Sequence, residues 1–268
     1  MRLVSFEGGA GVLRGERVHR LEGDPSLDLL VSERRLGEVR PVEDEGTSVA
    51  ELELRPPLAR PSKLICIGLN YRSHCEEQGA EPPRTPTFFA KFPNALVGHG
   101  ASVRLPGWSS RVDYEAEVAF VIGLRAKDVS EERALEHVAG YTLLNDLSAR
   151  DYQFKTPQWM PGKTFDGAAP CGPALVTTDE AGPPDSIELE LRLNGKLMQS
   201  ASTSDLVHSV PALVAYLSKL MTLEPGDLVA TGTPAGVGSL RDPKVWLQPG
   251  DELEISSPQL GALHTRLA

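Results

Sequence analysis

Short segments in which hydrophobic and polar residues alternate make up the first part of the chain. MRLVSFE and GVLRGERVHRL predict two strands joined by Gly8 and Gly9, and the alternation returns in VAELELR over residues 49–55. Three prolines lie between residues 55 and 63, and such a stretch is stiff and does not continue a helix or a strand. We therefore expect a small β-rich N-terminal domain over residues 1–58 and a larger domain over residues 59–268.

The larger domain is also rich in predicted strands. An Asn-Gly pair between two alternating segments is a strong short-range signal for a hairpin, so Asn194 and Gly195 predict a tight turn within residues 187–203. Further strands are predicted over residues 63–71, 112–123 and 140–148, and from residue 225 into a glycine-rich loop that ends at residue 238.

Two helices are predicted between these strands. The first covers residues 130–139, where Ser130 can cap the start, Glu131 and Glu132 suit the positive end, and Gly140 can close the helix. The second covers residues 210–221 and places three leucines on one face. These leucines are Leu213, Leu217 and Leu220.

The fold class follows from the balance of these elements. Strands outnumber helices and most of them pair with a neighbour in the chain, which predicts a mainly β fold with some α, either a mixed β roll or a sandwich. A doubly wound parallel sheet would need a helix between successive strands, and the pattern lacks these helices.

Composition narrows the class of protein further. The 268 residues include 27 Lys and Arg against 37 Asp and Glu, so the net charge is −10, and without a basic run this disfavours a nucleic-acid partner. No apolar stretch is long enough for a membrane span, and the first residues lack the apolar core of a signal peptide. The three cysteines are scattered and in no metal-binding spacing, so we expect a cytoplasmic protein without a disulfide framework.

Three carboxylates alternate at the start of one predicted strand. In Asp113-Tyr114-Glu115-Ala116-Glu117, residues two apart point to the same side, so the three acids would share one face. Like charges in such a row repel one another, and a hard divalent cation such as Mg²⁺, Mn²⁺ or Ca²⁺ would compensate them. The alternative interpretation is a solvated strand face.

A third ligand for such an ion could come from the next strand. Asp146 stands where the strand over residues 140–148 turns polar, and Arg150 and Asp151 follow it. The alternative is that Asp146 caps a turn within Asn-Asp-Leu-Ser, which is a common arrangement.

A histidine and a glutamate follow the strand over residues 63–71 at helical spacing. His74 and Glu77 are three residues apart, so on a helical turn their side chains would meet, and the carboxylate would support the imidazole as a general base. Gly79 and several prolines bound this segment, which could act as a short lid. From the spacing alone, a surface helix with an incidental pair is the simpler alternative.

Two other polar segments are candidates for anion binding. Lys163 lies in Gly-Lys-Thr, but the glycine that a phosphate loop requires is Pro157 here, so Lys163 is better interpreted as one cation that could hold a carboxylate or an enolate. Thr233 lies in a glycine-rich loop whose N–H groups and hydroxyls could bind an anion, and no dinucleotide fingerprint is present.

Taken in order, these segments resemble the fumarylacetoacetate hydrolase superfamily. The resemblance covers about residues 63–240 and is carried by NYRSHCEE, by Lys91 in FFAKFPNALVGHG, and by DYEAEVAFVIG, GYTLLNDLSARDYQ, GKTFDG, the Asn-Gly-Lys hairpin and LEPGDLVATGTPAGVG. Each motif is weak alone, and their shared order makes the match specific.

The resemblance implies a set of site residues and partners. Glu115, Glu117 and Asp146 would bind Mg²⁺, Mn²⁺ or Ca²⁺, and His74 and Glu77 would form a catalytic dyad on the lid. Arg150, Lys163 and Thr233 would hold the substrate, with Lys163 also counted among the catalytic residues. The family's fold is a β-rich catalytic domain, here over residues 59–268, that assembles as a homodimer.

The same resemblance implies a reaction class. The first reaction that the resemblance implies is metal-dependent hydrolysis. The enzyme would cleave a carbon–carbon bond of an acylpyruvate or fumarylacetoacetate-type 2-oxo acid, in aromatic compound catabolism. The alternatives are an oxaloacetate-type decarboxylase or a 2-hydroxyhepta-2,4-diene-1,7-dioate isomerase that uses the same site, and a metal-dependent binding protein without catalysis. Asn94 and His99 lie in the loop after Lys91, where family members vary, and do not translate into a substrate.

Overall fold

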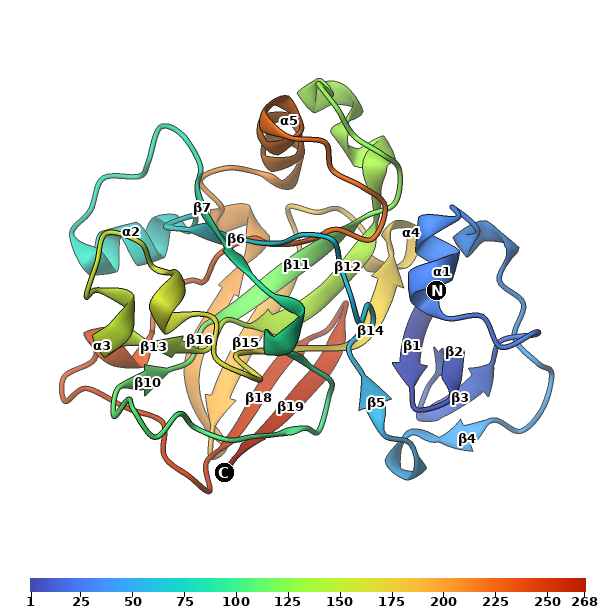
Figure 1. The fold of residues 1–268 in the computed structure, drawn as a ribbon, viewed down its shortest axis with the longest axis horizontal. Coiled ribbons are helices and arrows are strands. Elements are labelled where there is room, and N and C mark those ends of the chain that lie inside the picture. The colour runs from blue at the N-terminus through green and yellow to red at the C-terminus, as the bar shows by residue number, and fades with distance from the viewer.

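A long mixed sheet forms the framework of the protein in a computed structural model that describes residues 1–268 (Figure 1). Its strands follow the order β4-β3-β2-β1-β14-β12-β11-β17-β6-β7, while β5 pairs with β1 and β8 with β14. The strands of this sheet are β1 (Arg2–Phe6), β2 (Gly9–Arg14), β3 (Arg17–Arg20), β4 (Thr47–Ser48), β5 (Leu54–Arg55), β6 (Leu64–Gly68), β7 (Thr87–Lys91), β8 (Leu96–Val97), β11 (Ala116–Ile122), β12 (Val138–Asn145), β14 (Ala169–Thr177) and β17 (Leu228–Ala230).

A second sheet of five strands packs against the middle of the long sheet. Its order is β16-β15-β18-β19-β9, and β15, β18 and β19 contact β11, β12 and β14 of the long sheet. The strands are β9 (Ser102–Val103), β15 (Glu188–Leu193), β16 (Lys196–Ser202), β18 (Glu252–Ser257) and β19 (Gly261–Leu267). A separate short ladder joins β10 (Val112–Asp113) to β13 (Ser148–Ala149). Two packed, mainly antiparallel sheets confirm the predicted mainly β fold.

The predicted hairpin is present. Asn194 and Gly195 connect β15 to β16 with positive φ angles of 51° and 78°, the backbone conformation of the tight turn that Asn-Gly favours.

Helices are few and short. They are α1 (Leu27–Ser32), α2 (Arg72–Gln78), α3 (Arg150–Gln153), α4 (Thr178–Ala181) and α5 (Val210–Leu220). Single 3₁₀ segments occur at Leu36–Glu38, Val49–Glu51, Pro93–Ala95, Glu131–His137, Met160–Gly162, Thr203–Asp205 and Gly238–Leu240. No helix combines the length and the apolar character needed to cross a membrane.

Helix α5 matches its prediction except in its last turn. Ser209 caps it by accepting a hydrogen bond from the N–H of Ala212, and Leu213 and Leu217 are fully buried. Leu220, which we expected on the same buried face, is 51% exposed. The buried face continues at Ser218 instead, whose hydroxyl accepts a hydrogen bond from the N–H of Val129.

The predicted helix over residues 130–139 is present over a shorter range, and its predicted end at Gly140 is wrong. The segment is a 3₁₀ helix over Glu131–His137, and the Ser130 side chain makes no capping hydrogen bond. Gly140 does not close this helix but lies inside β12, where a Cβ atom would come within 2.2 Å of the Val176 carbonyl oxygen. The glycine therefore permits the close approach of β12 and β14 rather than a helix end.

The N-terminal segment extends the long sheet. Strand β1 pairs with β14, and Leu3 and Phe6 belong to the same hydrophobic core as Val118 in β11. In Figure 1 the blue N-terminal strands lie at one end of the long axis, beside β14. The segment 49–55, which we expected to be a strand, has only β5 at its end, because Val49–Glu51 turns as a 3₁₀ helix. The domain boundary at residue 58 stays a prediction.

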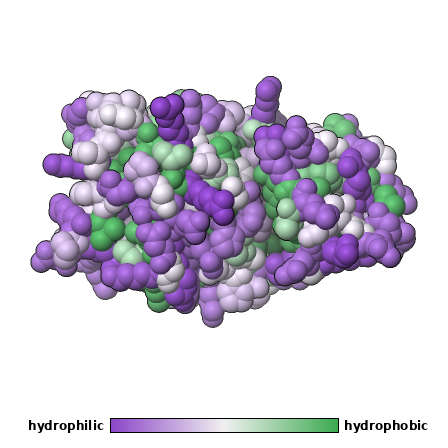
Figure 2. Space-filling model, turned by 90° about the horizontal axis from the view of Figure 1, so that it is seen from below, coloured by the Kyte–Doolittle hydropathy of each residue, from purple (hydrophilic) through white to green (hydrophobic).

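The surface is mostly polar. Figure 2 shows hydrophilic side chains over most of one face, with apolar patches separated by them. The large apolar side chains with high exposure include Phe92, Trp108 and Phe154, which are 48%, 47% and 66% exposed.

We predict that Gly140→Ala destabilises the protein, because its methyl group would overlap the Val176 carbonyl oxygen at 2.2 Å. Overpacking of this kind costs about 1–3 kcal/mol, which thermal or urea unfolding would measure. Gly37→Ala is the matched control, since nothing lies within 4 Å of a Cβ atom there. Equal stability of the two variants would contradict the close approach of β12 and β14.

Candidate active site

The pairing of β11 with β12 brings three acidic side chains together. Glu115 directly precedes β11, Glu117 lies within it, and Asp146 directly follows β12. The Ala116 position pairs with Asn145, and the N–H of Asp146 donates to the carbonyl oxygen of Glu115 at 2.9 Å. One oxygen of each acid lies within 4.8 Å of the others, and all three side chains are buried.

Buried cations neutralise two of these acids. The ammonium group of Lys163 lies 2.8 Å from Glu115 and 2.9 Å from Asp146, and Lys91 of β7 also pairs with Asp146. Arg150 forms a second ion pair with Glu115. Burial alone would raise the pKa of Glu115, but the charges of Lys163 and Arg150 outweigh it and lower this pKa to about 2.

Glu117 is the acid without a cation. Its carboxylate accepts a hydrogen bond from the N–H of Gly232 at 2.9 Å, and no ion pair reaches it. Burial and the neighbouring charges of Asp146 and Glu115 raise its pKa well above the usual value.

The charges of this buried cluster do not balance. Four carboxylates face three cations, which leaves one negative charge in the interior. The carboxylates are Asp113, Glu115, Glu117 and Asp146, and the cations are Lys91, Arg150 and Lys163. A proton or an added cation must offset the excess, because an uncompensated buried charge is costly. Carboxylate oxygens are the ligands that hard divalent ions prefer, so the three converging acids fit Mg²⁺, Mn²⁺ or Ca²⁺.

Asp113 lies outside the acidic triad, although its carboxylate and that of Glu115 both pair with Arg150. It belongs to the separate β10–β13 ladder, since the strand is interrupted before β11 begins. Its carboxylate accepts hydrogen bonds from the N–H groups of Gly238 and Ser239 and pairs with Arg150 at 2.9 Å. Asp113 therefore holds Arg150 and the glycine-rich loop rather than joining the acidic triad.

The histidine–glutamate pair is formed on α2, as the spacing predicts. Nδ1 of His74 lies 3.0 Å from one oxygen of Glu77, and the other oxygen of Glu77 accepts from the N–H of Gly236 at 2.8 Å. The side-chain amide nitrogen of Gln78 lies 2.7 Å from Nε2 of His74. With the Gln78 amide in this orientation its nitrogen donates to Nε2, and the ring N–H that faces Glu77 is then on Nδ1. Gly79 ends the helix with a φ of 64°.

A small cavity of about 60 Å³ connects these groups. It is lined by His74, Glu115, Arg150, Lys163 and Thr233, together with apolar and amide side chains such as Phe89, Phe154 and Gln153. The structure therefore brings together candidates that came from five separate segments of the sequence. Glu77 pairs with His74, whereas Glu117 and Asp146 are buried next to Glu115.

Gln199 of β16 is a site residue that the sequence did not indicate. Its side-chain oxygen accepts from the N–H of Ala116, and its nitrogen donates to the hydroxyl of Thr233 and the carbonyl of Pro234, each at 2.9 Å. Because the Thr233 oxygen is already an acceptor, its own proton is free to be donated elsewhere. No local sequence pattern indicates Gln199, because it lies 82 positions after Glu117 and only the folded structure brings the two strands together.

Lys91 is a site residue to which the sequence motifs assign no role. Its side chain is 2% exposed and bonds Asp146 and the carbonyl oxygens of Leu147 and Lys163. A lysine in the otherwise apolar strand segment FFAKF is the feature that could have indicated a buried partner.

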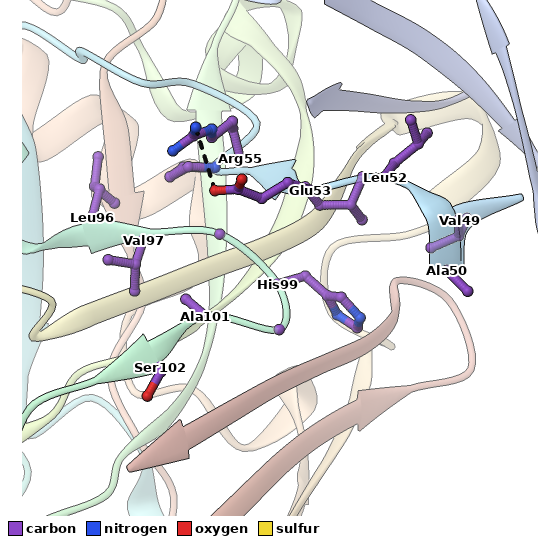
Figure 3. A pocket seen from close by; sticks show the side chains of 14 residues that line it. Val49, Ala50, Leu52, Glu53, Arg55, Leu96, Val97, His99, Ala101 and Ser102 are labelled. Carbon is purple, nitrogen blue, oxygen red and sulfur yellow. Dashed lines mark ion pairs between the residues drawn. The ribbon is translucent and has the colours of Figure 1, made fainter. Parts of the chain in front are cut away.

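A larger cavity lies away from these groups, between the N-terminal segment and the loop after β8 (Figure 3). It measures about 670 Å³, but its two ionic side chains, Glu53 and Arg55, pair with each other at 3.3 Å. His99 lines it and contacts the ring of His264 edge to face, and Asn94 bonds the backbone of Thr164. The cavity lacks the converging charged groups that chemistry would need.

The fold and the site define a mainly β protein with a buried acidic cluster suited to a divalent ion. The family model described as fumarylacetoacetate (FAA) hydrolase C-terminal matches residues 63–268, and the chain belongs to this family. The predicted resemblance is therefore confirmed.

Three similar proteins carry different activities in their names. A mitochondrial oxaloacetate tautomerase of Xenopus laevis is 46% identical over 218 residues, which is 81% of this chain and 68% of that protein. A 5-carboxymethyl-2-hydroxymuconate delta-isomerase from Mycobacterium smegmatis is 33% identical with a TM-score of 0.82, covering 100% of this chain and 99% of that chain. A maleylpyruvate hydrolase from Sphingobium sp. SYK-6, solved with manganese(II) and pyruvate, is 29% identical with a TM-score of 0.80 and the same coverage.

We predict that two substitutions in the acidic triad change the stability of the metal-free protein differently. Glu117→Gln should leave its stability unchanged or raise it by about 1 kcal/mol, because the raised pKa of Glu117 means that the folded state disfavours this charge. Glu115→Gln should lower stability by about 3–5 kcal/mol, because Lys163 and Arg150 lose a buried partner. Thermal unfolding with chelator measures both.

The change in unfolding temperature on addition of Mn²⁺ tests whether the same two acids hold a metal ion. Bound metal should raise the unfolding temperature of the unsubstituted protein, and both variants should lose most of that rise. An unchanged response to Mn²⁺ in both variants would show that these acids do not hold the ion.

Proposed function

We propose that the protein is a divalent-metal-dependent enzyme of 2-oxo acids, in which His74 transfers the proton. The observation that carries the proposal is the small cavity that His74 and Glu115 of the acidic triad both line. A histidine supported by Glu77 and a cluster with one excess negative charge meet there, and neither is explained by stability alone.

Glu115, Glu117 and Asp146 would hold the ion. When bound, a divalent cation supplies Lewis-acid polarisation of carbonyl oxygens on the substrate. The charge balance supports this, because a divalent ion changes the net charge of the buried cluster from −1 to +1. A cluster with one positive charge complements one carboxylate of a substrate.

Arg150, Lys163 and Thr233 would position the carboxylate end of the substrate. All three line the small cavity, and the two cations are held in place by Asp113, Glu115 and Asp146. The Thr233 hydroxyl can donate to an anion, because Gln199 already donates to its oxygen.

His74 would act as the base in its Nδ1–H form. Glu77 accepts a hydrogen bond from the Nδ1–H group, so Nε2 is the nitrogen that would take a proton once Gln78 moves aside. Glu77 also stabilises the imidazolium that results, while Gly236 holds the second oxygen of Glu77.

For the reaction itself we propose keto–enol tautomerisation of a 2-oxo acid of the oxaloacetate type. His74 would take a proton from carbon 3, the C–H electron pair would become the C2–C3 double bond, and the proton would pass to the oxygen on carbon 2. The 46% identity to a protein named oxaloacetate tautomerase supports this choice over the hydrolysis that the sequence motifs favoured first.

Carbon–carbon hydrolysis of an acylpyruvate is the second candidate. Its support is the similarity to a maleylpyruvate hydrolase over nearly the full length of both chains. In that reaction His74 would take a proton from water, and the resulting hydroxide would attack the distal carbonyl. The adduct would collapse by breaking the adjacent carbon–carbon bond, whose electron pair would form the enolate of the 2-oxo acid, and His74 would return the proton to that carbon.

A substrate panel separates these reactions. Oxaloacetate enol, an acylpyruvate, fumarylacetoacetate and 2-hydroxyhepta-2,4-diene-1,7-dioate would each be followed in the ultraviolet with Mg²⁺ or Mn²⁺ and with chelator. Metal-dependent conversion of the oxaloacetate enol is the expected result. Product analysis would distinguish it from cleavage or loss of CO₂, and the absence of turnover on all four would contradict the proposal.

We predict that His74→Gln lowers turnover by about 10²–10⁴-fold, the usual contribution of a positioned general base. Metal affinity should stay within a few fold, because His74 is not among the three clustered acids. His264→Gln is the matched control, since that imidazole is 51% exposed on β19. Retained turnover in His74→Gln would refute its role as the proton-transfer group.

We also propose a cytoplasmic location and a homodimer. Three buried cysteines, Cys66, Cys75 and Cys171, without a disulfide among them support the first. The family resemblance is the support for the second.

A further inference from the structure

Both ring nitrogens of His74 already have a partner. Nδ1 lies 3.0 Å from Glu77, and Nε2 lies 2.7 Å from the side-chain nitrogen of Gln78. All three residues belong to α2, and Gln78 comes one helical turn after His74, so the contact is local to this short helix. The proposed proton transfer needs a free lone pair on Nε2, but here that lone pair accepts the Gln78 amide.

Nε2 can accept from only one partner at a time. A neutral ring nitrogen of this kind carries a single lone pair, and the Gln78 nitrogen lies at hydrogen-bond distance from it. A group that gives its proton to Nε2 must also come within about 2.6–3.2 Å of it. Carbon 3 of a bound 2-oxo acid therefore needs the place that Gln78 occupies, and the two compete for one position.

The Gln78 side chain is held by little else. It is the last residue of α2, it is exposed, and the bond to His74 is the one hydrogen bond of its side chain. By contrast, Glu77 is fixed through both of its oxygens, to His74 and to the N–H of Gly236. Displacement of Gln78 therefore breaks a single hydrogen bond, whereas displacement of Glu77 would break two.

Gln78 also stands between two cavities. It lines the small cavity of about 60 Å³ and a second cavity of about 410 Å³, and His74, Arg150 and Phe154 line both as well. The small cavity is far below the roughly 300–1,000 Å³ of usual ligand sites, so a substrate needs room from its neighbour. Arg150 is held by two ion pairs, whereas Gln78 and Phe154 are exposed. The movement that joins the two cavities therefore falls to these two exposed side chains.

We propose that Gln78 is a gate on the proton-transfer nitrogen: its amide occupies Nε2 of His74 in the resting protein, and a bound 2-oxo acid takes its place. The inference rests on the proposed function, because it assigns the proton transfer to Nε2. Gln78 is a positioning residue, which holds His74 in the Nδ1–H form before the substrate arrives. The contact is autoinhibitory, since it must break before the base can act.

Removal of this contact should strengthen substrate binding rather than weaken it. Each binding event includes the loss of the bond between Gln78 and His74, and one net hydrogen bond in a protein corresponds to about a two- to tenfold change in an equilibrium constant. A variant without the donor starts in the state that binds substrate, so its apparent affinity rises by that factor.

Gln78→Met tests the gate by binding, because methionine has a similar length and cannot donate to Nε2. Calorimetric titration of the Mg²⁺-loaded protein with pyruvate should show an affinity about two- to tenfold higher in this variant. Gln78→Asn, whose amide is one carbon shorter in reach, should also bind pyruvate more tightly. Glu76→Gln is the matched control with unchanged affinity, since Glu76 is exposed on the same helix and lines neither cavity.

Nitrogen NMR of the histidine rings observes the contact itself, because the signal of an unprotonated ring nitrogen moves when its hydrogen bond is lost. The His74 signals are identified by their absence from His74→Gln. Without substrate, Nε2 should be unprotonated in the unsubstituted protein, and its signal should shift in Gln78→Met. Addition of pyruvate to the unsubstituted, Mg²⁺-loaded protein should also shift this signal, because Gln78 then leaves Nε2.

The outcomes separate the inference from the proposed function. If Gln78→Met binds pyruvate equally or more weakly, or leaves the Nε2 signal unchanged, the gate is refuted and the proposed function stands. A lower turnover number with unchanged pyruvate affinity would refute the gate too, because Gln78 would then act in the reacting complex. If the unsubstituted protein neither binds nor converts any 2-oxo acid, the proposed function fails, and the inference fails with it.

Discussion

The burial of four carboxylates beside three cations is the constraint on which the rest of the site depends. Each ion pair in the cluster joins segments that are distant in sequence, so the charges can be satisfied only when the sheets are assembled. Lys163 is the centre of this arrangement, because it contacts both Glu115 and Asp146. Glu117 is the one acid without a cation, so its buried negative charge is unfavourable until a positive charge is added. The stability of the fold and the chemistry that we propose therefore depend on the same carboxylate.

The sheets place the reactive groups by ordinary rules of strand pairing. Antiparallel pairing of β11 and β12 puts the residue before one strand beside the residue after the other, so Glu115 and Asp146 become neighbours at one edge. Helix α2 follows β6 and presents His74 to the same place, and the loop after β17 closes the site through Gly232 and Gly236. Rigid elements thus hold the acids, whereas a short helix and a loop hold the groups that would move protons.

The parts of this arrangement that depend on local spacing could be predicted from the sequence. The separation of His74 and Glu77 on one helical turn and the Asn-Gly turn are both local, and the structure contains both. Glu115 and Glu117 follow from the period of a strand, but the period does not show that Asp113 belongs to the separate β10–β13 ladder, because the break between β10 and β11 has no local signal. Gly140 shows the same limit: its neighbour is the Val176 carbonyl on β14, which only the assembled sheet brings near.

A bulge in the hairpin of β15 and β16 determines how Gln199 contacts the candidate active site. Leu191 pairs with Gln199 and Arg192 with Leu197, so Met198 is an extra residue on β16. Met198 and Gln199 are consecutive and both are buried. With this one inserted position, the Gln199 amide reaches Thr233, and the Met198 carbonyl accepts from Arg241. Deleting a single residue between the turn and Gln199 would rotate that amide to the opposite side of the strand, so the length of a surface hairpin governs which way a hydroxyl in the cavity can donate.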